Sequence, residues 1–171
     1  MSSPKAVAAA DSLPREKVEQ FDRQLAALVR RYPEDRRASA LIPALRLGQE
    51  LFGHLAPEVQ LLAAARLGVT PARADEVATF YQMFHTRPPG RHVVEMCTNV
   101  SCCLTGAEQI WTHLQRKLGV KPGETTADGR ITLREVECLG SCGTAPAMLV
   151  DEEMYERLTV EKVDEILGRL E

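Results

Sequence analysis

Cysteine spacing constrains this chain more than any other feature of its 171 residues. Four cysteines form two pairs, Cys97 with Cys102 and Cys138 with Cys142, with four and three residues between the members. A predicted helix and a predicted strand separate the two pairs. Folding can therefore bring two short loops together around one centre, and the arrangement indicates a site built from four thiolates.

Net charge and hydropathy indicate the cellular compartment of the protein. The formal net charge is -3, so the chain lacks the basic excess that nucleic acid or an anionic membrane would select. No apolar run approaches the roughly 20 residues of a membrane helix, and residues 1–10 make a poor secretory signal. We expect a cytoplasmic protein, in which clustered cysteines indicate metal or redox chemistry rather than disulfides.

Three chemistries remain open for four reduced cysteines. A 2Fe-2S cluster needs two thiolates on each iron, which two cysteine pairs supply, and Gly140 and Gly143 suit tight loops whose N–H groups turn toward sulfur. Structural zinc takes four cysteines but favours pairs with two residues between them, as does a thioredoxin-type dithiol site. The spacing favours iron–sulfur over zinc, and zinc over dithiol catalysis.

A fifth cysteine, Cys103, competes with Cys102 for one ligand position, and spacing alone cannot choose between them. We expect Cys103 to be a small apolar residue that faces the following helix, because a buried free cysteine commonly behaves as a hydrophobe.

The first half of the chain is expected to be helical. Residues 1–12 have no periodicity and are predicted to be a flexible tail, and residues 13–87 are predicted to form a four-helix bundle. The apolar spacing and the Pro, Thr and Gly signals predict helices over residues 14–32, 39–54, 57–67 and 70–85. Phe80, Tyr81 and Phe84 are expected to pack in the core of this bundle rather than face a partner.

The second half, residues 88–171, is expected to be mixed α and β. Two prolines and Gly90 at residues 88–90 predict the domain boundary. Alternating and helical apolar patterns then predict strands over 91–97, 130–136 and 147–150, and helices over 107–118 and 159–170. The fold class is therefore α+β.

Two longer motifs carry a family resemblance. The runs from Glu95 to Cys102 and from Glu137 to Pro146 resemble the small thioredoxin-like 2Fe-2S subunit of the NADH dehydrogenase module of bacterial respiratory complex I. The likeness extends through Thr79–Tyr81, Phe84 and residues 146–159. It implies a helical bundle followed by a thioredoxin-like domain, and it implies Cys97, Cys102, Cys138 and Cys142 as ligands of one 2Fe-2S cluster. Cys103 falls on a position that is not a family ligand.

The resemblance also implies an electron carrier that is not catalytic alone. In that family a larger iron–sulfur subunit carries FMN and the NADH site, and the complex places the small subunit at the inner face of the cell membrane without inserting it. Related subunits serve NAD-dependent formate dehydrogenases and bidirectional hydrogenases, so the host complex stays open. The chain has no Gly-x-Gly-x-x-Gly and no Walker loop, in agreement with nucleotide chemistry on a partner.

Overall fold

The computed structural model describes residues 12–170, so the expected tail, apart from Ser12, lies outside the described residues. This part of the chain divides into two compact units between Pro88 and Pro89. In residues 12–170, no helix combines the length and the apolar character needed to cross a membrane.

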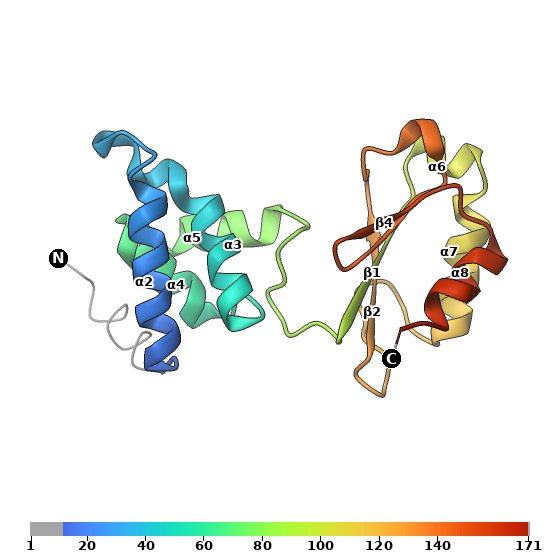
Figure 1. Ribbon diagram of the computed structural model, residues 1–171, viewed down its shortest axis with the longest axis horizontal. Coiled ribbons are helices and arrows are strands. Elements are labelled where there is room, and N and C mark those ends of the chain that lie inside the picture. The colour runs from blue at the N-terminus through green and yellow to red at the C-terminus, as the bar shows by residue number, and fades with distance from the viewer. Residues whose placement is uncertain (1–11, 171) are drawn as a thin grey trace. The chain divides into compact units, whose positions relative to one another are not determined.

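From residue 12 to Pro88, the first unit has helices as its regular elements (Figure 1). Its elements are α2 (Arg15–Val29), the 3-10 segment η1 (Glu34–Ala40), α3 (Leu41–Phe52), α4 (Pro57–Leu67) and α5 (Pro71–Phe80). All four helices predicted for this half are present. The sequence pattern did not predict η1, which ends at Ala40 and so takes up the first two residues of the second predicted helix. The core includes Phe21, Leu45 and Leu62, each fully buried.

Local signals set most of these helix ends. The Thr70 hydroxyl accepts the Arg73 N–H and caps α5, while Pro57 and Pro71 stand at the first helical positions, where an N–H would have no partner. Gly53 and Gly68 follow α3 and α4 in the left-handed conformation, which glycine adopts without the steric cost of a Cβ.

Helix α5 ends at Phe80, five residues before the predicted end at His85. Tertiary hydrogen bonds override the helical pattern here: the His85 N–H donates to Gln49 Oε1 at 2.6 Å, and the Leu55 N–H donates to the His85 carbonyl at 2.7 Å. The turn brings Phe84 into the core but leaves Phe80 77% exposed and Tyr81 partly exposed. The prediction of core packing was right for Phe84 and wrong for Phe80 and Tyr81.

The second unit is built on a four-stranded sheet with the strand order β2-β1-β3-β4. Its elements are β1 (His92–Cys97), α6 (Val100–Leu104), α7 (Ala107–Leu118), β2 (Ile131–Val136), the 3-10 turn η2 (Cys142–Thr144), β3 (Met148–Val150), β4 (Glu153–Tyr155) and α8 (Val160–Leu167). Strands β1 and β2 are parallel, and the other neighbouring pairs are antiparallel. The structure therefore has the mixed α and β content that the sequence predicted.

Helices α7 and α8 pack against each other, and α7 also packs against β1 and β2 (Figure 1). A parallel strand pair needs a crossover connection, which α6 and α7 supply between β1 and β2. The buried layer between helix and sheet contains Met96, Leu114 and Leu133, all fully buried. The N-cap of α8 is Thr159, as predicted, and its hydroxyl accepts the Lys162 N–H.

Candidate metal centre

The first cysteines of the two pairs lie at the same edge of the sheet. Cys97 is the last residue of β1 and pairs in register with Val136, the last residue of β2. Cys138 follows two residues later, and the Cys97 thiol lies 3.8 Å from the Glu137 carbonyl oxygen. Because parallel strands end at a common edge, β1 and β2 deliver Cys97 and Cys138 to one place.

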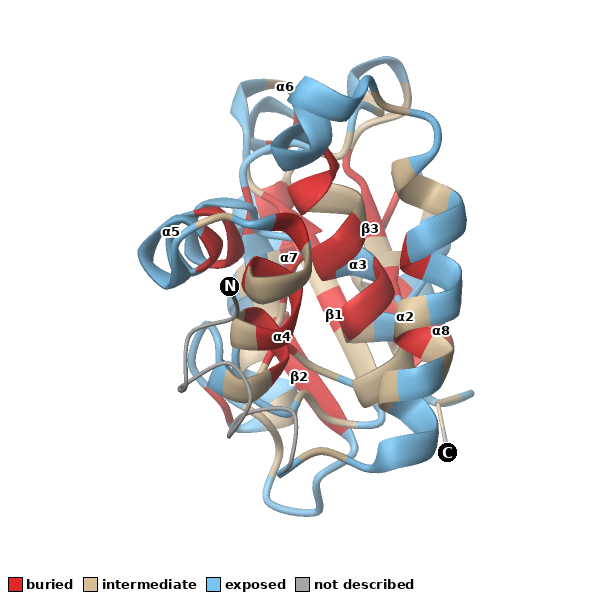
Figure 2. Ribbon diagram, turned by 90° about the vertical axis from the view of Figure 1, so that its left-hand side faces the viewer, coloured by how far each residue is buried: buried red, intermediate tan, exposed pale blue. Residues whose placement is uncertain are grey.

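Helix α6, which the sequence pattern did not predict, carries Cys102. Asn99 caps it by accepting the Val100 N–H at 2.7 Å, and this Asn was the available signal for the helix start. Most of α6 is exposed (pale blue in Figure 2), but Cys102 is buried, with only 2% exposed.

The Cys102 thiol lies beside other sulfurs of the set. Burial, together with the neighbouring thiols of Cys97 and Cys142, raises the pKa of Cys102 to about 11, while a hydrogen bond from the Ala147 backbone opposes the rise. Helix α6 also packs against η2, which begins at Cys142. Three of the four predicted ligands thus converge from β1, α6 and η2.

The loop from Cys138 to Cys142 completes the set from the solvent side. Gly140 has a left-handed φ of 75°, and its N–H donates to Cys138 Sγ at 3.3 Å, which is the loop geometry expected around a sulfur ligand. Cys138 and Cys142 are exposed, whereas Cys97 and Cys102 are buried. The site therefore has an interior half and a surface half.

Cys103 does not face the core, so the expectation of a buried apolar residue was wrong. Its side chain is exposed, and its Sγ lies 3.0 Å from the Thr98 carbonyl oxygen. On a helix, consecutive side chains point about 100° apart, so α6 turns Cys103 away when it directs Cys102 inward.

The chemistry of the donor set fits a 2Fe-2S cluster. Cysteine thiolates are the usual ligands of such clusters, and here the thiols of Cys97 and Cys142 neighbour that of Cys102, while Cys138 follows two residues after the end of β2. Within residues 12–170, no three histidine, cysteine or carboxylate side chains are gathered tightly enough to hold a single metal ion. The charged neighbours Glu95 and Arg134 pair with each other at 3.3 Å.

Comparison with known proteins decides the family. The family model of the thioredoxin-like [2Fe-2S] ferredoxins matches residues 25–171. The chain belongs to this family. Membership confirms the resemblance seen in the sequence motifs. The cofactor of this thioredoxin-like ferredoxin is therefore a 2Fe-2S cluster.

Named relatives of this thioredoxin-like ferredoxin agree with the family. An NADH-quinone oxidoreductase subunit of Rhizobium meliloti is 44% identical over 144 residues, which cover 84% of each chain. An NADH-quinone oxidoreductase subunit of Thermus thermophilus is 39% identical over 141 residues, which cover 82% of this chain and 78% of the relative.

A solved structure shares the fold of this ferredoxin. An air-oxidised NAD⁺-reducing [NiFe]-hydrogenase superposes with a TM-score of 0.68 at 24% identity, over 81% of this chain. The match spans about a quarter of that hydrogenase chain, 24% of its length.

Proposed function

We propose that this chain is the electron-transfer subunit of an NADH-quinone oxidoreductase, and that Cys97, Cys102, Cys138 and Cys142 hold its 2Fe-2S cluster. The observation that carries the proposal is that the thiols of Cys97 and Cys142 neighbour that of Cys102, at the end of the sheet where Cys138 follows β2. The identities of 44% and 39% to NADH-quinone oxidoreductase subunits favour this host over a formate dehydrogenase or a hydrogenase.

When bound, a 2Fe-2S cluster accepts and returns one electron at a time. The chain's own residues hold and shield it. Cys97 and Cys102 bind from the buried side, where β1 and α6 fix their backbones, and Cys138 and Cys142 bind from the exposed loop. The surface half leaves one side of the site open to a redox partner.

We infer that the partner is a larger subunit that carries FMN and the NADH site, because no nucleotide-binding motif occurs in this sequence. Val100 and Leu104 are 68% and 83% exposed on α6, on either side of Cys102 in sequence. Exposed apolar side chains at a redox centre suit a surface that a partner covers. Through that complex the chain would sit at the cytoplasmic face of the membrane, with residues 13–87 as a helical bundle and residues 88–171 as the cluster domain.

NADH reduction tests the proposal directly. Anaerobic holoprotein mixed with NADH alone should keep its oxidised visible spectrum, and addition of the flavin-bearing subunit of the same complex should bleach it. Leu104→Glu should slow this bleaching while leaving reduction by dithionite unchanged. Bleaching by NADH without the flavin subunit would contradict the proposal, as would failure of the dithionite-reduced cluster to pass its electron to the oxidised flavin subunit.

A further inference from the structure

The exposed cysteine loop is tied to a segment far along the chain. The Arg157 N–H donates to the Thr144 carbonyl at 2.8 Å, and the Leu158 N–H donates to the Pro146 carbonyl at 3.1 Å. Both donors lie in the connection between β4 and α8. These two main-chain hydrogen bonds fix this connection against the end of the cysteine loop.

Glu156, at the start of this connection, reaches into the loop with its carboxylate. Its Oε1 accepts a hydrogen bond from the Ser141 hydroxyl and another from Thr144 Oγ1 at 2.5 Å. The two hydroxyl oxygens are themselves 2.6 Å apart. One carboxylate oxygen therefore joins the two residues on either side of Cys142 and Gly143.

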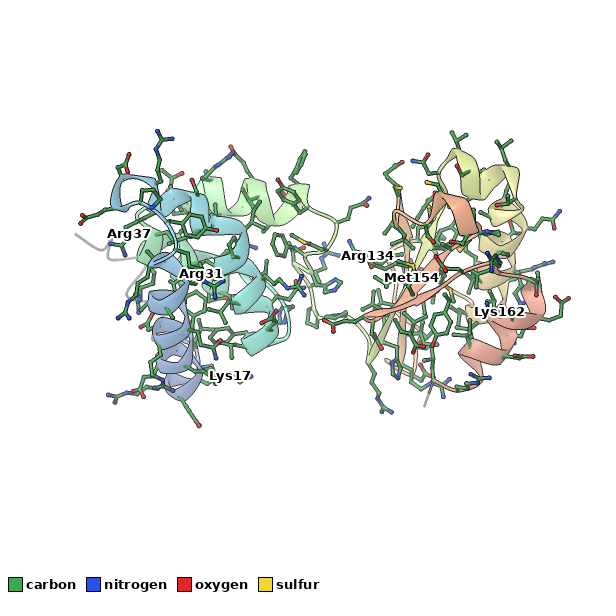
Figure 3. The ribbon with its side chains drawn as sticks, turned by 45° about the horizontal axis from the view of Figure 1, so that its top comes forward. Lys17, Arg31, Arg37, Arg134, Met154 and Lys162 are labelled. Atoms are coloured by element: carbon green, nitrogen blue, oxygen red, sulfur yellow. The ribbon has the colours of Figure 1, made fainter. Side chains whose placement is uncertain are left out.

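The backbone of Glu156 is held in its turn. The ammonium of Lys162 on α8, which is labelled in Figure 3, donates a hydrogen bond to the Glu156 carbonyl oxygen at 2.6 Å. Arg157 has a φ of 48°, a left-handed conformation that residues other than glycine rarely adopt. A non-glycine residue keeps this conformation when the surrounding contacts demand it, and here they are the hydrogen bonds from the Arg157 and Leu158 N–H groups and the bond from Lys162 to the Glu156 carbonyl.

The two halves of the metal site differ in what holds them. Cys97 is the last residue of β1 and lies in the core with Val94 and Met96 of the same strand, and Cys102 is also in the core. Cys138 and Cys142 bound an exposed loop that contains Gly140 and is followed by Gly143, so the local backbone supplies little rigidity. Contacts from outside the loop must supply the rest.

We propose that Glu156 is a positioning residue for the 2Fe-2S cluster, whose carboxylate fixes the turn bearing Cys142 through the hydroxyls of Ser141 and Thr144. This rests on the proposed function, in which Cys142 is a ligand. Groups that orient a metal ligand through hydrogen bonds commonly change metal affinity by about tenfold to a hundredfold when removed.

Iron release from the anaerobic holoprotein to a ferrous chelator is the measurement. Glu156→Ala should release iron about tenfold faster than wild type and broaden the EPR signal of the reduced cluster, because Cys142 then samples several positions. Glu156→Gln keeps an oxygen that can accept both hydroxyl protons, so it should restore most of the wild-type rate. Glu165→Ala and Glu165→Gln are matched controls, since Glu165 is an exposed carboxylate on α8. Equal release rates for Glu156→Ala and Glu165→Ala would overturn the proposal.

A double-variant cycle separates the hydrogen bonds from the charge of Glu156. In a Ser141→Ala, Thr144→Val background, Glu156→Ala should add less than about a twofold change, because the path to Cys142 is already cut. A full multiplicative effect would show that Glu156 acts on the cluster by another route, and would overturn the proposal. If Glu156→Ala yields no folded protein, Glu156→Gln and Thr144→Val decide it: the first should release iron near the wild-type rate and the second several-fold faster.

Failure of this proposal is distinguishable from failure of the proposed function. Wild-type protein without a 2Fe-2S cluster, or a Cys142→Ala variant with an unaltered cluster, would defeat the proposed function. A normal wild-type cluster, its disruption in Cys142→Ala and an unchanged release rate in Glu156→Ala would defeat only the role of Glu156.

Discussion

The two segments that carry the cysteine pairs reach the same site by different means. The segment with Cys97 and Cys102 belongs to the core: one cysteine ends a central strand and the other is 2% exposed on a capped helix. The segment with Cys138 and Cys142 is an exposed loop held by Glu156 and by hydrogen bonds from residues 157 and 158. The difference teaches that, in the proposed metal site, the positions of Cys97 and Cys102 depend on core packing, whereas those of Cys138 and Cys142 depend on polar contacts.

The largest expected effect concerns the neighbouring residues Cys102 and Cys103. Cys102→Ala should abolish the normal 2Fe-2S spectrum, because the inward-facing thiolate is lost and α6 directs Cys103 to the surface. Cys103→Ala should leave the visible and EPR spectra almost unchanged. The opposite outcome would mean that α6 rotates to bring Cys103 inward. Cys102 would then not be the buried ligand that the comparison requires.

Removing an apolar side chain next to Cys97 should cost more unfolding free energy than removing one next to Cys138. Met96→Ala, next to Cys97, removes a fully buried side chain and should lower the free energy of unfolding by about 2–5 kcal/mol. Leu139→Ala, next to Cys138, removes a partly buried side chain and should cost about 1 kcal/mol or less. Urea unfolding of the metal-free protein measures both, and similar losses would contradict the contrast.

Alkylation of the metal-free protein should separate the same two groups. Exposed Cys138 and Cys142 should react with iodoacetamide about a hundredfold faster at pH 8 than Cys102, whose raised pKa of about 11 leaves it almost wholly protonated. Peptide mass spectrometry over time gives each rate, and exposed Cys103 serves as an internal reference. Uniform reactivity would show that the core segment opens readily without its cofactor.

The smallest expected effect is on the pH dependence of the stability contributed by α8, the helix whose Lys162 bonds the Glu156 carbonyl. Hydrogen bonds from Lys117 and His113 hold the pKa of Asp164 below its usual value. The resulting stabilisation is present above the unfolded-state pKa and is lost as the pH falls through the lower folded-state pKa. Asp164→Asn should therefore lower the urea midpoint slightly at pH 7 and have less effect near pH 3. An equal change of the urea midpoint at pH 7 and pH 3 would show that the ionised carboxylate of Asp164 does not stabilise the fold.

The sequence predicted the elements whose signals are local. Proline and glycine placed α4 at residues 57–67, and Thr159 marked the start of α8, because caps act over a few residues. The predicted helix and strand between the two cysteine pairs also indicated that their loops can meet, and the structure adds that Cys97 ends β1 and pairs with the last residue of β2, two residues before Cys138. The ligand set itself stays a prediction, to which the structure adds proximity.

Other features depend on contacts that local patterns do not encode. The early end of α5 depends on Gln49, more than thirty residues away in sequence. Helix α6 is five residues long, too short to give a clear apolar period, so the outward direction of Cys103 could not be anticipated. Glu156 gives no periodic signal either, because its role depends on two hydroxyls brought to it by the fold.

Metal and sulfide analysis of the anaerobically purified wild-type chain tests the central claim most directly. If the four cysteines hold one 2Fe-2S cluster, the reddish-brown protein should contain about two iron atoms and two acid-labile sulfides per chain. Colourless protein that contains one tightly bound zinc per chain and no acid-labile sulfide would contradict the account.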